Sequence, residues 1–289
     1  MNQAQTLIAI ESMIDGIHYK QRDNGHIRDQ LQVLIPAFKI QHIENVWYSQ
    51  HIQIFIHLMN NVDYYLKGHS YDNIDTFLDQ EVDFLRSLVD VNYSHVHVER
   101  NAFQMQETRN RQSLREYMTR VMHQKSRSLV VRVDLKYLTH CHEQIDIISF
   151  SQHMATLRNR ISNGDRCFAD LEGFVWAMEQ GGRSGGFHCH LMLIYDGHKH
   201  QNDYGLAIAV GHLWREITND MGCFYTSNDP ETKQRFADQD KLMLGRIERS
   251  DAKLLQNVID YDYFAQPDKV DQRMRVKLQC RSRTFGTGQ

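Results

Sequence analysis

Residues 179–197, EQGGRSGGFHCHLMLIYDG, combine a carboxylate, a glycine-rich turn and a closely spaced histidine pair. The run before the turn, residues 174–179, is rich in aromatic and apolar residues, as β-strands are. A second apolar run follows the turn and begins with His188, Cys189 and His190. Alternate side chains of a strand share a face, so both imidazoles point one way and Cys189 points the other. We therefore expect a hairpin that presents two imidazoles on one side of a sheet.

The register of this hairpin decides whether a metal site forms. If the strands pair antiparallel around a turn of residues 180–187, Glu179 lies opposite His188 and Ala177 lies opposite His190. Directly opposed residues share a face and have close Cβ atoms. One carboxylate and two imidazoles then converge beside the small Ala177 side chain, and such sets bind divalent metals. A slip of one residue would turn Glu179 away.

A His-x-His pair is a weak motif by itself. With 17 His in 289 residues, chance yields about one such pair. Three other pairs are more simply interpreted as solvated or packed histidines: His95/His97, His140/His142 and His198/His200. Only His188/His190 combines an apolar strand, a hairpin and an upstream carboxylate.

Composition indicates an ordinary globular protein. Hydrophobic residues make up 41% and charged residues 24% of 289 positions, enough for one large or two modest domains. The five cysteines show no CxxC spacing, which favours reduced thiols in a cytosol over a disulfide framework or a zinc finger. No apolar run has membrane-spanning length and no signal peptide is recognisable. We expect a cytoplasmic protein without a membrane partner.

Charge is distributed unevenly along the chain. The formal net charge is −3, which does not indicate a nucleic-acid-binding protein. Residues 107–127 nevertheless carry six basic residues against two acidic ones, and so do residues 265–289. Basic segments of this kind either contact phosphates or form solvated faces, and the sequence leaves both interpretations open.

Apolar spacing divides the chain into two parts. Residues 1–125 show helical periodicity and few glycines, which predicts a mostly helical N-terminal domain whose role is unknown. Residues 126–289 alternate strands and helices, which predicts an α+β domain with an antiparallel sheet and packed helices. The expected elements are strands over 129–138 and 242–247, helices over 147–161, 204–217 and 251–264, the hairpin, and a short strand or tail over 276–285.

The expected late helix contains two tyrosines. A metal at the hairpin could activate water for hydrolysis, or it could polarise a phosphodiester for attack by a protein nucleophile. Tyr261 and Tyr263 are candidates for that nucleophile. Residues two apart on a helix face nearly opposite ways, so we expect only one of them to reach the site. Periodicity does not choose between them.

Residues 128–289 resemble the replication proteins of the inovirus gene-two type and related prophage-encoded proteins of the YagK/YfjJ kind. These are similar to HUH endonucleases, which initiate rolling-circle replication. Four segments in order carry the resemblance: VRVDLKY at 131–137, WAMEQ…GFHCHLMLI at 176–194, GHLWREI at 211–217 and RTFG at 283–286. It does not reach the first 120 residues.

The resemblance implies an HUH-like nuclease domain that nicks one strand of DNA. His188, His190 and Glu179 would hold Mg²⁺ or Mn²⁺, and a tyrosine would be joined to the 5′ phosphate. In this family that tyrosine opens a Tyr-x-x-Lys pattern, which favours Tyr263 over Tyr261, although Gln266 stands where lysine is expected and Lys269 is the substitute. Asp134, in the first strand, would assist the ligands or be structural.

The resulting hypothesis is a site-specific single-strand endonuclease that initiates replication of a phage, prophage or satellite in a bacterial host cell. Its expected partners are single-stranded or hairpin origin DNA and host replication proteins, with residues 1–125 recognising one of them. The competing hypothesis is a catalytically inactive DNA-binding regulator of the same fold, favoured by Gln266. A metal hydrolase of small phosphoesters is the weakest hypothesis, because the chain has no P-loop.

Overall fold

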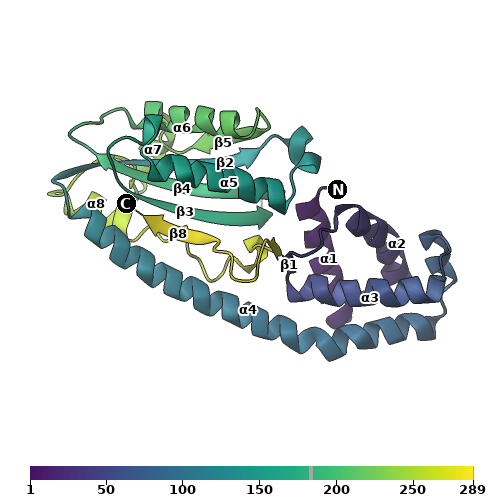
Figure 1. The fold of residues 1–289 in the computed structure, drawn as a ribbon. Coiled ribbons are helices and arrows are strands. Elements are labelled where there is room, and N and C mark those ends of the chain that lie inside the picture. Colours follow the sequence, from purple (N-terminus) through teal and green to yellow (C-terminus); the bar gives the residue numbers. More distant parts are fainter. Residues whose placement is uncertain (182–184, 289) are drawn as a thin grey trace.

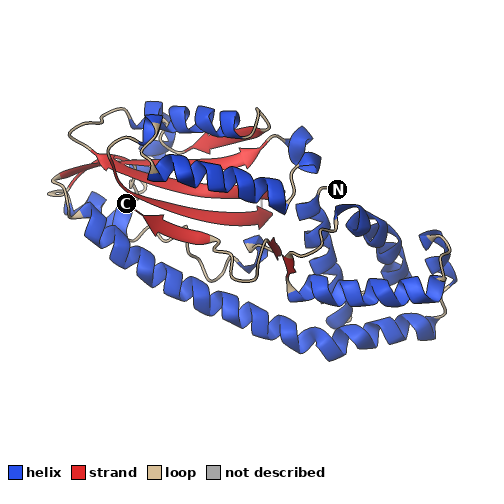
Figure 2. Ribbon diagram, viewed as in Figure 1, coloured by secondary structure: helices blue, strands red, loops and turns tan. Residues whose placement is uncertain are grey.

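The computed structural model describes residues 1–181 and 185–288. It has the predicted α+β fold, with helices in the N-terminal part and an antiparallel sheet covered by helices in the C-terminal part (Figure 2). The division into domains at residue 125 stays a prediction. Residues 182–184, in the predicted turn, lie outside the described residues.

The sheet is built around three long strands that pair side by side. Strand β4 (Gly186–Asp196) pairs with β2 (Arg127–Tyr137) on one edge and with β3 (Leu171–Gly181) on the other. Shorter strands extend both sides, in the order β5-β2-β4-β3-β8, and β6 pairs with the remaining part of β2. The short strands are β5 (Gly222–Thr226), β6 (Gly245–Glu248) and β8 (Phe285–Gly288).

The predicted hairpin register is confirmed. Glu179 lies opposite His188, and Ala177 lies opposite His190. On the other side of β4, Asp134 of β2 lies opposite His190. Three adjacent strands therefore present polar side chains at one place on a single face.

Helices cover both faces of the sheet (Figure 1). One face packs residues such as Leu129, Leu191 and Leu193 into the core with α5 (Ile147–Ser162) and α6 (Asp203–Ile217). Alternate residues point the other way, so Val130, Met192 and Ile194 pack with α4 (Asp79–Met122) and α8 (Ala252–Ile259). His188 and His190 share the parity of Met192 and therefore lie on the α4/α8 face.

The N-terminal part consists of helices, as predicted. They are α1 (Gln3–His18), α2 (Asn24–Gln41), α3 (Gln50–Leu66) and the first half of α4. At 44 residues, α4 is about 66 Å long, and Figure 1 shows it along one edge of both parts of the molecule. The two-residue strands β1 (Trp47–Tyr48) and β7 (Val276–Lys277) also connect the parts.

The prediction of a helix over 251–264 is wrong beyond residue 259. Helix α8 ends at Ile259, and residues 260–265 form a turn that places Phe264 and Ala265 in the α4/α8 core. Asp260 and Asp262 are unfavourable at the negative end of a helix, and α4 offers them Arg115 and Arg111 at 3.1 and 3.9 Å. The sequence analysis also did not predict strands β1 and β5, helix α7 (Pro230–Asp238) or the short 3₁₀ helices.

Candidate metal centre

The three predicted ligands meet on the α4/α8 face of the sheet. The Oε2 atom of Glu179 lies 3.4 Å from His188 Nε2 and 3.3 Å from His190 Nε2. One ligand atom from each residue falls within 4.8 Å of the others, and all three side chains are buried. Antiparallel pairing of β3 with β4 produces this convergence, as the sequence predicted.

Asp134 orients one of the imidazoles. Its Oδ1 atom lies 2.7 Å from His190 Nδ1, so the Nε2 atom of that ring is directed toward Glu179. Arg132, on the same face of β2, donates to both carboxylate oxygens of Asp134 at 3.1 and 3.2 Å. Hydrogen bonding of a ligand histidine to a carboxylate is common at metal sites, because it fixes the ring and raises its basicity.

Neighbouring groups shift the pKa values of Glu179 and His190 in opposite directions. Burial alone would raise the pKa of Glu179, but hydrogen bonds from His188 and His190 and the charge of Lys269 hold it far below its usual value. Burial would lower the pKa of His190, but hydrogen bonds to Asp134 and Glu179 raise it. The neighbours thus favour an ionised Glu179 and positive charge at the His190 ring, while Lys269, 3.3 Å from Glu179, and Arg132, 3.1 Å from Asp134, balance the two carboxylates.

Both candidate tyrosines lie beside this group. The Tyr263 ring is 4.8 Å from the His190 ring, centroid to centroid, and the Tyr261 ring stacks on Tyr263 at 5.9 Å and 8°. The guanidinium of Arg132 lies 4.3 Å from the Tyr263 centroid and hydrogen-bonds the Tyr261 hydroxyl. Of the two rings, only that of Tyr263 contacts a ligand histidine, and helical spacing is not the cause, because both tyrosines follow the end of α8 and share no helix.

Tyr261 and Tyr263 differ in their contacts. Burial raises the pKa of its hydroxyl well above the usual value, and the nearby charge of Arg132 offsets that effect only in part. Both tyrosines are half-buried, and the Tyr263 ring is the one that contacts His190. Tyr263 is therefore the tyrosine adjacent to the candidate ligands.

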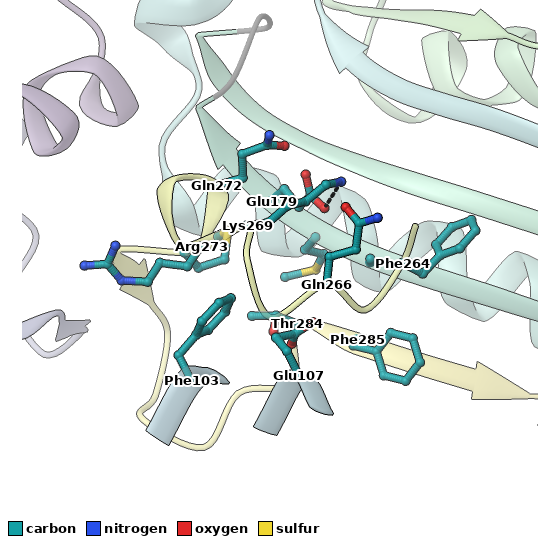
Figure 3. A pocket seen from close by; sticks show the side chains of 13 residues that line it. Phe103, Glu107, Glu179, Phe264, Gln266, Lys269, Gln272, Arg273, Thr284 and Phe285 are labelled. Carbon is teal, nitrogen blue, oxygen red and sulfur yellow. Dashed lines mark hydrogen bonds and ion pairs between the residues drawn. The ribbon is translucent and has the colours of Figure 1, made fainter. Parts of the chain in front are cut away.

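Lys269, the expected substitute for a lysine at residue 266, has its amine beside Tyr263 and Glu179. Its Nζ atom lies 3.5 Å from the centroid of the Tyr263 ring, 3.3 Å from Glu179 Oε1 and 3.4 Å from the Tyr263 carbonyl. Gln266 and Lys269 line one small pocket, and Figure 3 shows their side chains beside Glu179. The turn after α8 thus replaces helical spacing in bringing a lysine to the tyrosine.

Glu107 is a pocket residue that sequence reasoning missed. It projects from α4 into a small pocket of about 30 Å³ that Glu179 and Lys269 also line (Figure 3). Burial raises its pKa to about 7, with a smaller contribution from the negative charge of Glu179. In the sequence it is one acidic residue in an arginine-rich helix, and only tertiary packing reveals its burial.

A second histidine and carboxylate group lies in the N-terminal part. Glu11, Asp15 and His51 also have ligand atoms within 4.8 Å of one another. Arginines already neutralise these carboxylates: Arg273 lies 2.6 Å from Glu11, and Arg100 lies 2.7 Å from Asp15. This group connects α1 and α3 to the segment after the tyrosines and leaves little negative charge for a metal.

The other His-x-His pairs have separate surroundings. His95 and His97 are exposed on α4, and His198 contacts Ser126 in a polar loop. His142 lies 3.0 Å from the Tyr137 carbonyl. Within residues 1–181 and 185–288, none of these pairs belongs to a group with metal-binding geometry.

The model of the YagK/YfjJ C-terminal domain matches residues 104–275, more than half of the chain. The chain belongs to this family. The matched region of this YagK/YfjJ protein includes the three candidate ligands, both tyrosines, Lys269 and Glu107. No curated protein and no solved structure matches the chain. Among the helices of the described residues, none combines the length and hydropathy needed to cross a bilayer.

Proposed function

We propose that this protein is a site-specific single-strand DNA endonuclease of the HUH type, which starts rolling-circle-type replication of a phage, prophage or satellite element. The supporting observation is the position of the Tyr263 ring, 4.8 Å from the ring of His190 within a group that includes His188 and Glu179. A nucleophile beside a metal-binding group is what metal-assisted phosphodiester cleavage through a covalent intermediate requires.

Mg²⁺ or Mn²⁺ is the cation proposed for this donor set. Glu179 supplies an ionised carboxylate, and the two imidazoles supply nitrogen atoms on the same side of the sheet. Such a cation, when bound, would withdraw electron density from the scissile phosphate. His188, His190 and Glu179 would hold it, and Asp134 would keep the His190 ring in position.

The chain's own residues account for the rest of the reaction. The Tyr263 oxygen attacks phosphorus, a P–Oη bond forms and the bond from phosphorus to the 3′ oxygen breaks. The phenol loses one proton and the departing 3′ oxygen gains one, so the products are a 5′-phosphotyrosine and a free 3′ hydroxyl. Lys269 and Arg132 place positive charge over the Tyr263 ring, which stabilises the phenolate that forms.

A second candidate is a regulator that binds DNA without cutting it. The observation that favours it is Gln266, which replaces the lysine of the Tyr-x-x-Lys pattern. The position of Lys269 Nζ, 3.5 Å from the Tyr263 centroid, favours the nuclease instead, because a cation still lies at the tyrosine.

Covalent capture tests the proposal. The protein is incubated with Mn²⁺ and labelled single-stranded fragments that tile the DNA around its gene, and adducts are separated on a denaturing gel. We expect an adduct with the unmodified protein and with Tyr261→Phe, and none with Tyr263→Phe. Loss only in Tyr261→Phe would move the nucleophile. Tight binding without any adduct would contradict the nuclease and favour the regulator.

A further inference from the structure

Tyr225 lies on the sheet face that carries the candidate ligands. It belongs to the edge strand β5 and pairs directly with Asp134 of β2, which in turn pairs with His190 of β4. Directly opposed residues of neighbouring strands share a face, so these residues form one row across the sheet. Two strand spacings, about 10 Å, separate Tyr225 from His190.

The other face of β5 is covered by helix α6, which Figure 1 shows beside this strand. Phe224 points to that side, because a Cβ atom on Gly211 of α6 would touch its ring. Tyr225 is the next residue and points the opposite way. It is 48% exposed, and its side chain forms no hydrogen bond or ring contact with residues 1–181 and 185–288.

A lysine lies beside this tyrosine on the same face. Lys136 follows Asp134 by two residues along β2 and lies opposite Cys223 of β5. Within the described part of the chain, its amine forms no salt bridge and no hydrogen bond. Arg132 and Lys269, by contrast, each contact a carboxylate of the site. Lys136 is therefore a positive charge that the surrounding residues do not neutralise.

An exposed ring and a nearby lysine are the two elements of a site for a single nucleic-acid strand. Bases stack on aromatic side chains whatever their identity, and basic side chains contact the backbone phosphates. A base within a duplex is stacked on its neighbours and cannot lie on a protein ring unless it is flipped out. A solitary exposed tyrosine would be ordinary, but this one shares a row with a candidate metal ligand.

We propose that β5 and the adjacent end of β2 form a subsite for single-stranded DNA beside the metal centre, in which a base stacks on Tyr225 and Lys136 contacts a phosphate. This inference rests on the proposed function, because the strand that Tyr263 attacks is the occupant. The bound strand extends from the ligand group across Asp134 to the edge of the sheet. Since every base has a flat face, the subsite holds the strand without selecting its sequence.

Fluorescence anisotropy with a labelled oligothymidylate measures this subsite without DNA cleavage. Tyr225→Ala should weaken the dissociation constant roughly 5–150-fold, equal to the loss of about 1–3 kcal/mol from one base stack. Tyr225→Phe keeps a ring and should bind as the unmodified protein does. The matched control is Tyr204→Ala, which removes a tyrosine that is 43% exposed on α6, across the sheet from the ligands, and should leave the affinity unchanged.

The salt dependence of the same affinity tests the phosphate contact. Lys136→Gln should reduce the slope of the logarithm of the dissociation constant against the logarithm of salt concentration by about 0.7, the value for one contact to a single strand. Tyr225→Ala should weaken binding and leave this slope unchanged, because a stacked base carries no charge. An unchanged slope in Lys136→Gln would contradict the phosphate contact.

Photocrosslinking identifies the residue that the base contacts. The oligothymidylate carries 5-iododeoxyuridine in place of one thymidine, and crosslinked peptides are mapped by mass spectrometry after irradiation. We expect the crosslink in the peptide that contains Tyr225, and we expect it to persist in Tyr204→Ala and to disappear in Tyr225→Ala.

These measurements separate the subsite from the nuclease. If Tyr225→Ala binds oligothymidylate as tightly as the unmodified protein, the subsite is refuted even when the adduct with Tyr263 forms. Weaker binding by Tyr225→Ala in a protein that forms no adduct would support the subsite and contradict the nuclease. Absence of binding by the unmodified protein would overturn the subsite. So would a dimer that Tyr225→Ala dissociates without a change in DNA affinity, because this sheet edge would then pair with a second copy.

Discussion

The hydrogen bond between Asp134 and His190 offers a test of the metal centre that does not require DNA cleavage. Asp134→Asn keeps the shape of the side chain, and its Oδ1 atom can still accept a hydrogen bond from His190 Nδ1–H, but the substitution removes a buried negative charge 2.7 Å from that atom. The charge of Arg132, 3.1 Å from Asp134, then has no carboxylate beside it. Both effects make a cation at the His190 ring less favourable.

The expected magnitude follows from these contacts. Loss of a carboxylate that orients a ligand histidine weakens metal binding roughly 10–100-fold, which corresponds to about 1.4–2.7 kcal/mol. Isothermal titration calorimetry with Mn²⁺ at neutral pH measures this change directly. We expect the unmodified protein to bind one equivalent, and Asp134→Asn to bind it more weakly by that factor.

Asp15→Asn is the matched control. Asp15 also accepts a hydrogen bond from a buried histidine, with 3.0 Å between its Oδ1 atom and His51 Nε2, but it belongs to the group that arginines neutralise. Its substitution should leave Mn²⁺ binding unchanged. Equal Mn²⁺ affinity in folded Asp134→Asn and in the unmodified protein would refute the assignment, and loss of binding in Asp15→Asn would move the metal to the N-terminal part.

Two further predictions concern stability. Glu107 has a folded pKa of about 7 against an ordinary value of 4.5. The folded state keeps a proton that the unfolded state loses, so the free energy of unfolding should fall as the pH rises from 4.5 to 7. Glu107→Gln should remove that fall and stabilise the protein at pH 8 by on the order of 2 kcal/mol, measured by urea titration. A variant with the same pH dependence of stability as the unmodified protein would contradict the burial of Glu107. A Cβ atom on Gly211 would lie 2.3 Å from the ring of Phe224. Gly211→Ala should therefore lower the free energy of unfolding by about 1–3 kcal/mol, although alanine has the higher helix propensity. An unchanged thermal midpoint would show that α6 can move away from β5.

Much of the hairpin could be predicted from the sequence. Its strands are adjacent along the chain, and strand alternation fixes which side chains share a face. The short connection then limits the register, which is why residue order alone is enough to place Glu179 opposite His188. The helices of the N-terminal part were predictable for a similar reason, since apolar spacing is a local property.

Only the tertiary structure decided what surrounds the three ligands. Asp134 reaches His190 because β2 pairs with β4 across 56 positions of sequence, and no local pattern specifies which strand a hairpin will join. Lys269 and Tyr263 meet because the chain turns after Ile259 instead of continuing α8. Glu107 enters the pocket because α4 packs across the sheet. Periodicity determines which face each element presents, but long-range packing determines which faces meet.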